Sequence, residues 1–473
     1  MKKRVLAFIF TGFSLATAAQ VKLPAIFSDN MVLQQQADVP IWGKASPGAR
    51  VTVKSGWDNK QYTATVASDS TWKVCIHTPA ASNNNFELTI SSGKERTVLK
   101  EVAIGEVWLC SGQSNMEMPM KGFPSQPILG GLDDIVHSTN SSIRCFTVKR
   151  NSSITPQTDC VGSWESASPN TTPDFTATGY YFARLLQELL QIPVGIIHSS
   201  WGGASIEAWM PRECFAAFPH IKVPNSQSEL EPPHTTPTGL YNGMLYPFIG
   251  FTLKGAIWYQ GETNASRYRS YPELFKAMHH EWNKAWGCGD FPIYFCQIAP
   301  HKEPLKAGKA FMREAQMLIA QTQPRTGIAI LMDAGDLEGV HPANKRVAGE
   351  RLAYIALARD YGYKNLPHEA PVFRNVTFKE NGMAVVSFDK IGTGLSTFGE
   401  VLTGFELAGE DRKFYPAKAS INRYYRTVEV TSDQVPHPIA VRYAFKGYIK
   451  GTLFGSNGLP ISSFRSDKWN DVE

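Results

Sequence analysis

Residues 105–116, Gly-Glu-Val-Trp-Leu-Cys-Ser-Gly-Gln-Ser-Asn-Met, mark the point where the pattern of the sequence changes. The apolar run at 107–110 ends in a polar turn that contains Gly112, as expected where a buried strand passes into a loop. Comparable apolar runs follow at 194–198, 253–259, 292–296 and 327–332. Helical patterns separate them at 180–190, 271–286, 311–323 and 344–360. Buried strands that alternate with amphipathic helices predict an α/β fold with a mostly parallel sheet covered on both faces.

The segments on either side of this region have a different pattern. From about residue 23 to 104, short runs of alternating polar and apolar residues are separated by turn formers, which is typical of an antiparallel β-sandwich. Similar runs return after about residue 367. We therefore predict an N-terminal β-sandwich module at 20–104, an α/β domain at 105–366 and a C-terminal β-rich module at 367–473.

The first residues have the composition of a secretory signal peptide, which we place at 1–19. Lys2, Lys3 and Arg4 precede an apolar run at 5–15, and small residues predict cleavage near Ala18 and Ala19. A membrane anchor is the alternative, but this run is shorter than the roughly 20 residues that a membrane span needs. We expect a secreted or periplasmic protein without a membrane span.

The charge and cysteine content exclude several classes of protein. Removing residues 1–19 lowers the formal net charge from +5 to +2, which gives no reason to expect a nucleic acid or an anionic membrane as partner. The chain has seven Cys and no Cys-x-x-Cys pair, so neither a zinc ribbon nor a thioredoxin-like site is expected. Cys75 and Cys110 lie in strand-like runs and are predicted to be buried, although some pairing stays open in an exported protein.

Polar residues follow several of the predicted parallel strands. In open parallel sheets, ligands bind beyond the carboxyl ends of the strands. The loops there contain Ser114, the Gly202-Gly203 pair, the block at 260–264 and the block at 333–341 with its late His341. Each alone has an ordinary explanation, such as a helix N-cap at Ser114 or a tight turn at the glycines. Together they supply a hydroxyl, backbone N–H donors, a side-chain amide or carboxylate and an imidazole, the groups of Ser–His acyl transfer.

No other chemistry competes with this interpretation. The sequence contains no phosphate-binding loop, no dinucleotide fingerprint and no coherent metal cluster, so we predict neither a cofactor nor a metal. The serine is not in the Gly-x-Ser-x-Gly turn of α/β-hydrolases, because that pattern fails at Met116.

The motifs around these residues resemble those of the sialate O-acetylesterase family, a branch of the SGNH-type esterases. The resemblance begins with residues 105–116. It continues with Ser200-Trp-Gly-Gly-Ala-Ser-Ile-Glu-Ala-Trp, Trp258-Tyr-Gln-Gly-Glu-Thr-Asn and His341-Pro-Ala-Asn-Lys, and extends to Phe27-Ser-Asp-Asn-Met-Val-Leu-Gln and Ala440-Val-Arg-Tyr-Ala-Phe. It implies an SGNH-hydrolase (flavodoxin-like) three-layer α/β/α core as the catalytic domain at 105–366, flanked by β-sandwich-like modules.

The same resemblance implies roles for individual residues. Ser114 corresponds to the nucleophile and His341 to its general base. The N–H groups of Ser114 and Gly203 and a side-chain amide of Gln260 or Asn264 would bind the oxyanion.

The acid that orients His341 stays open, because the sequence departs from the family pattern. SGNH enzymes usually have Asp three residues before the His, where this chain has Glu338, and many relatives have Asp two before, where it has Gly339. Related acetyl esterases use the Glu that corresponds to Glu262, which we favour. Asp336 and Glu338 are the other candidates, and a Ser–His dyad supported by a backbone carbonyl is a further alternative.

The predicted function is that of an exported serine esterase acting on O-acetyl esters of sialic acid. An acetylxylan or other polysaccharide O-acetylesterase is the first alternative, because specificity resides in loops such as 121–140 and 219–237. A non-catalytic glycan-binding protein is a remote alternative.

The expected partner is an O-acetylated sugar or glycan. A sialate site would be expected to hold Arg against the carboxylate, but no single Arg stands out. The sequence does not predict an oligomeric state.

Overall fold

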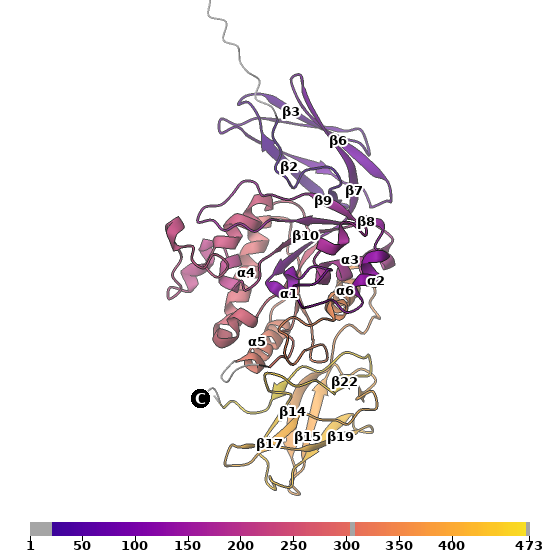
Figure 1. Ribbon diagram of the computed structural model, residues 1–473, viewed down its shortest axis with the longest axis vertical. Helices are drawn as coiled ribbons and strands as arrows, with labels where there is room; N and C mark the ends of the chain where they lie inside the picture. The colour runs from indigo at the N-terminus through magenta and orange to yellow at the C-terminus, as the bar shows by residue number, and fades with distance from the viewer. Residues whose placement is uncertain (1–20, 303–307, 470–473) are drawn as a thin grey trace, which may run out of the picture.

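A largely parallel sheet lies at the centre of the molecule (Figure 1). The computed structural model describes residues 21–302 and 308–469, so the predicted signal peptide at 1–19 lies outside the described residues. The strand order is β13-β12-β11-β7-β10-β8-β9, and every neighbouring pair is parallel except β8 and β9. The strands span Thr326–Ala329 (β13), Ile293–Cys296 (β12), Gly255–Tyr259 (β11), Glu95–Gly112 (β7), Val194–Ser200 (β10), Asn140–Thr147 (β8) and Trp164–Ala167 (β9).

Helices cover both faces of this sheet, because its strands are apolar on both sides. In β7, Val107 and Leu109 join one core with helices α4 (Tyr271–Trp286) and α5 (Lys309–Thr322). Trp108 and Cys110, which alternate with them, join a second core with α3 (Ala177–Leu190) and α6 (Lys345–Asp360). The prediction of an α/β fold with buried parallel strands is therefore confirmed.

The remaining helical segments are short. They are α1 (Ser114–Glu117), α2 (Gly131–Val136), η1 (Thr172–Asp174), η2 (Ile206–Trp209), η3 (Arg212–Ala217), η4 (Gln227–Glu229), η5 (Tyr241–Leu245), η6 (Tyr246–Phe248) and η7 (Glu262–Ser270).

Six strands precede β7 in the described residues; four of them belong to the same sheet as the central strands, and the second and fifth pair separately. The six strands are β1 (Val32–Gln34), β2 (Asp38–Lys44), β3 (Arg50–Ser55), β4 (Gln61–Thr65), β5 (Thr71–His77) and β6 (Asn85–Ser92). Strand β7 pairs with β6 through its first half and with β10 and β11 through its second half. The predicted boundary between residues 104 and 105 thus falls inside a single strand, which fixes the N-terminal strands relative to the core.

Cys75 is exposed, contrary to the sequence prediction. In β5, Trp72, Val74 and Ile76 take the inward positions, and the two-residue period of a strand turns Cys75 outward. Cys110 is buried as predicted, and all seven cysteines are free thiols in this structure.

The C-terminal strands form two sheets around a shared core. The strand orders are β14-β15-β20-β19 and β18-β17-β21-β23, with β16 and β22 pairing separately. The core includes Val386, Leu407, Val428 and Tyr443. The strands span Val372–Phe378 (β14), Ala384–Asp389 (β15), Leu395–Ser396 (β16), Phe405–Ala408 (β17), Phe414–Pro416 (β18), Lys418–Asn422 (β19), Thr427–Thr431 (β20), Ala440–Tyr443 (β21), Phe454–Gly455 (β22) and Phe464–Arg465 (β23).

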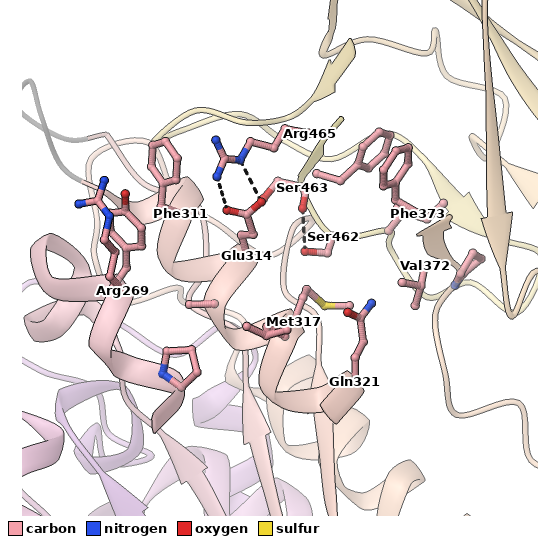
Figure 2. A pocket seen from close by; sticks show the side chains of 17 residues that line it. Arg269, Phe311, Glu314, Met317, Gln321, Val372, Phe373, Ser462, Ser463 and Arg465 are labelled. Carbon is pink, nitrogen blue, oxygen red and sulfur yellow. Dashed lines mark hydrogen bonds and ion pairs between the residues drawn. The ribbon is translucent and has the colours of Figure 1, made fainter. Parts of the chain in front are cut away.

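Helix α5 contacts these C-terminal strands through an ion pair (Figure 2). Arg465 donates to both carboxylate oxygens of Glu314 at 2.9 Å, and its guanidinium lies over Phe311. A cavity of about 460 Å³ lies at this junction, but neither Ser114 nor His341 lines it.

Within the two described segments, no helix combines the length and the apolar character that crossing a membrane requires.

Candidate active site

Ser114 and His341 lie side by side, although 227 positions separate them in the sequence. Strand β7 ends at Gly112, and Ser114 begins the single turn of α1 directly after it. His341 lies before α6, whose N-cap is Asn344 as predicted, with its side chain accepting from the Val347 N–H. Ser114 Oγ and His341 Nε2 are 2.7 Å apart, within hydrogen-bond distance. The structure thus brings the predicted hydroxyl and imidazole into direct contact.

The second ring nitrogen of His341 contacts a residue that the sequence analysis did not single out. Gln126 Oε1 lies 2.6 Å from His341 Nδ1. A carbonyl oxygen only accepts, so Nδ1 carries the hydrogen and Nε2 of the neutral ring is left to accept from the Ser114 hydroxyl. Phe123, on the same loop, packs against the imidazole with ring centroids 5.3 Å apart. The loop therefore holds both the tautomer and the orientation of His341.

His341 is neutral over most of the pH range. Burial lowers the pKa of its imidazole to about 4, and the positive charge of Lys345 contributes in the same direction. A neutral imidazole is the form that accepts a proton, so His341 is prepared to act as a base.

In the described part of the chain, the hydrogen-bond partners of His341 are Gln126 and Ser114, and none of the three candidate acids is among them. Glu262 Oε1 accepts from Asn115 Nδ2 at 2.7 Å. Asp336 accepts from the backbone N–H of Glu338, and Glu338 pairs with exposed Lys302. The favoured assignment of Glu262 as the direct partner of Nδ1 is thus not what this geometry shows, because Gln126 occupies that position.

Glu262 instead belongs to a buried network behind Ser114. Asn115 Nδ2 donates to Glu262 and also to the carbonyl oxygen of Val340 at 3.0 Å, directly before His341. Asn115 Oδ1 accepts from the buried Lys345 ammonium. Burial lowers the pKa of Lys345 to about 7 and raises that of Glu262. The network ties the turn that carries Ser114 to the loop that carries His341.

The Gly202–Gly203 turn lies against the same helical turn. A Cβ added at Gly202 would lie 3.0 Å from Glu117 Oε2 and 3.5 Å from Ser114 Cβ, so the backbone of this turn packs closely against the turn that carries Ser114. The Gly202 N–H donates to Glu117 Oε2 at 2.8 Å. Gly203 has a φ of +75°, and its carbonyl accepts from the Thr263 hydroxyl at 3.0 Å. These contacts fix the peptide whose N–H was predicted to bind the oxyanion.

The two predicted side-chain amides are engaged within the protein. Gln260 Nε2 donates to Ala204 O at 3.1 Å and to Asn264 Oδ1 at 2.7 Å, so both of its hydrogens are used. Asn264 Nδ2 donates to Glu207 at 3.0 Å, and both amides are fully buried. Gln260 therefore has no free hydrogen for a substrate oxygen. Its hydrogen bonds instead stabilise the loop after β10.

No group of three or more His, Cys, Asp or Glu within residues 21–302 and 308–469 is arranged to hold a metal ion.

The residues that sequence reasoning missed are Gln126, Asn115 and Lys345. Asn115 and Lys345 stand inside the quoted motifs next to predicted residues. Gln126 stands in a loop with no pattern of its own, and no local signal distinguishes it.

Comparisons with known proteins point to one family. Residues 104–353, just over half of the chain, match the family described as carbohydrate esterase, sialic acid-specific acetylesterase. The chain is 30% identical to the sialate O-acetylesterase of Homo sapiens over 397 residues, which cover 74% of this chain and 73% of that protein. It is 29% identical to the sialate O-acetylesterase of Mus musculus over 433 residues, which cover 77% and 79%.

A solved structure has the same overall arrangement. A carbohydrate acetylesterase from Xanthomonas citri superimposes with a TM-score of 0.86 at 35% identity, covering 95% of this chain and 100% of that chain. The similarity therefore extends beyond the central sheet to the flanking strands.

Proposed function

Because the chain belongs to the sialic acid-specific acetylesterase family of carbohydrate esterases, we propose that it removes O-acetyl groups from sialic acid by a Ser–His mechanism outside the cytoplasm. Membership makes it a carboxylic ester hydrolase that acts on O-acetylated sugars. The observation that carries the mechanism is the 2.7 Å contact between Ser114 Oγ and His341 Nε2.

In the first half of the reaction, Ser114 Oγ attacks the acetyl carbonyl carbon while His341 Nε2 takes the hydroxyl proton. The imidazolium that forms donates from Nδ1 to Gln126 Oε1, which stabilises the charge. The N–H groups of Ser114 and Gly203 donate to the tetrahedral oxyanion. The Ser114 N–H is suited to bind the oxyanion because Ser114 is the first residue of α1, and the first N–H of a helical turn has no acceptor within the helix.

Collapse of the intermediate breaks the bond between the carbonyl carbon and the sugar oxygen. His341 returns its proton to that oxygen, and the sugar leaves with a free hydroxyl. Water then enters, gives a proton to His341 Nε2 and attacks the acetyl-enzyme. Release of acetate restores the Ser114 hydroxyl and the neutral imidazole.

Hydrolysis assays on a panel of acetylated sugars test the identity of the substrate. With purified protein lacking residues 1–19, we expect acetate release from O-acetylated sialic acid with kcat/KM at least about tenfold above that for acetylated xylo-oligosaccharides. A preference for the xylo-oligosaccharides would contradict the proposal. It would favour the alternative of a polysaccharide O-acetylesterase, which has support in the broader description of the Xanthomonas citri protein as a carbohydrate acetylesterase.

Export is the second part of the proposal. Its support is the basic and apolar pattern of residues 1–19, which ends in small residues near Ala18 and Ala19. N-terminal sequencing of protein recovered outside the cytoplasm would identify the cleavage site.

We expect Gln126→Ala to lower kcat on p-nitrophenyl acetate by about 10- to 100-fold, because the imidazole loses the group that fixes its tautomer. Gln126→Glu places a carboxylate at Nδ1 and is expected to move the acid limb of the pH profile upward from about 4, because a negative charge raises the pKa of His341. A merely structural role for Gln126 would not shift that limb.

The matched variants Asp336→Asn and Glu338→Gln remove the other nearby carboxylates. Both should keep activity within about threefold of the wild type, because neither contacts His341. If Glu262→Gln lowers kcat more than Gln126→Ala and shifts the acid limb, the carboxylate of Glu262 controls His341, and the role proposed for Gln126 is wrong.

A further inference from the structure

A guanidinium group lies next to the proposed nucleophile. Arg150 follows β8, and its Nε donates to Glu117 Oε1 at 2.6 Å, while Nη2 lies 2.6 Å from the same oxygen. Glu117 stands three residues after Ser114, on the same helical turn. A Cβ added at Gly202 would lie 3.5 Å from Ser114 Cβ and 3.9 Å from Arg150 Nη2. Ser114 and the guanidinium therefore flank the same glycine.

This guanidinium is held in place before any substrate arrives. Its central carbon lies 5.3 Å from the centroid of the Trp201 ring, and Glu117 pairs with one of its edges. These contacts engage Nε, Nη2 and one face of the group, and Nη1 takes part in none of them. The side chain is nevertheless 52% exposed. An Arg side chain fixed by stacking and by one ion pair loses little conformational freedom when it binds an anion.

The charge of Glu117 is already satisfied. One of its oxygens accepts from Arg150 and the other from the Gly202 N–H, and only 14% of its side chain is exposed. An approaching anion therefore meets the exposed Arg150 more readily than the carboxylate that anchors it.

We propose that Arg150 binds the carboxylate of the acidic sugar whose acetyl group Ser114 attacks, and so selects sialic acid over neutral acetylated sugars. The inference rests on the proposed function, because it requires a substrate with a carboxylate on the sugar ring. Planar guanidinium groups match carboxylates through two parallel hydrogen bonds, whereas the neutral pentoses of xylan offer no such partner. Arg150 is thus a specificity-determining residue, distinct from the groups that transfer the proton.

The test compares O-acetylated sialic acid with the same sugar carrying a carboxamide in place of the carboxylate, and it measures acetate release. We expect the wild type to prefer the free acid by about 10- to 100-fold in kcat/KM, the range of one charge-assisted pair. Arg150→Gln should lose that preference, mainly through a higher KM for the acid. Its rates on the carboxamide and on p-nitrophenyl acetate should change by less than about threefold.

Two variants serve as controls. Lys149→Gln removes a neighbouring exposed positive charge and should keep the preference for the acid, because a general attraction of anions is not the cause. Arg150→Lys keeps the charge without the planar fork and should recover only part of the preference.

Each other outcome overturns the inference in a distinguishable way. If Arg150→Gln slows all three substrates equally, Arg150 only holds Glu117 and, through it, Gly202. If the wild type hydrolyses the acid and the carboxamide equally well, sialate hydrolysis stands and Arg150 does not read the carboxylate. If the wild type releases acetate only from neutral sugars, the proposed substrate and the role of Arg150 both fail.

Discussion

Ser114→Ala is expected to lower kcat for p-nitrophenyl acetate by about 10⁴- to 10⁶-fold, the loss that follows removal of a serine nucleophile. The reason is that Ser114 Oγ is in contact with His341 Nε2. Among the described residues, no other hydroxyl is hydrogen-bonded to that nitrogen. Initial rates at saturating substrate, with folding checked by circular dichroism, measure the effect. Residual activity above about one per cent would contradict the assignment.

A second serine–histidine pair supplies a matched control. Ser200 Oγ lies 2.6 Å from His198 Nε2, also at the end of a central strand. Both residues are buried, and burial lowers the pKa of His198 to about 4. Because Ser200 as a whole is only 4% exposed, an ester has little access to its hydroxyl, and Ser200→Ala should keep activity within about threefold. Loss of turnover in Ser200→Ala with survival in Ser114→Ala would reverse the assignment.

His341→Ala should lower kcat by a similar factor of about 10⁴ to 10⁶, and combining it with Ser114→Ala should cost little more, because the two groups act as a unit.

His341 also sets the pH dependence of kcat/KM. Its pKa of about 4 means that kcat/KM of the wild type stays high as the pH falls from 7 to 5 and is halved near pH 4, where the imidazole becomes protonated. His341→Ala should lack this acid limb. An acid limb near 6.5, the ordinary histidine value, would contradict the lowered pKa of the half-buried imidazole.

The sequence predicted most of the fold because its patterns are local. Apolar runs at 107–110 and 194–198 are buried on both faces, and such runs alternating with helices leave few arrangements open. The continuity of β7 was not predictable, since the change of pattern at Gly105 marks a change of neighbours and not a break in the strand. Cys75 shows the same limit, because its inward or outward direction depends on register.

Ser114 and His341 were predictable because both stand where the chain leaves a parallel strand or enters the following helix. The partner of His341 was not, since Gln126 reaches Nδ1 from a loop 215 positions away. Family-based reasoning favoured Glu262, which the structure places on Asn115 instead. Arg150 was not predictable either, because its position near Ser114 depends on contacts with Glu117 and Trp201 that exist only in the folded chain.

The most direct test of the central claim, that Ser114 Oγ is the atom that becomes acylated, is to identify the serine that reacts with an alkyl fluorophosphonate. Peptide mass spectrometry of the inactivated protein should place one adduct on Ser114, and His341→Ala should react far more slowly. An adduct on Ser200 or another serine, or inactivation without an adduct on Ser114, would contradict the account.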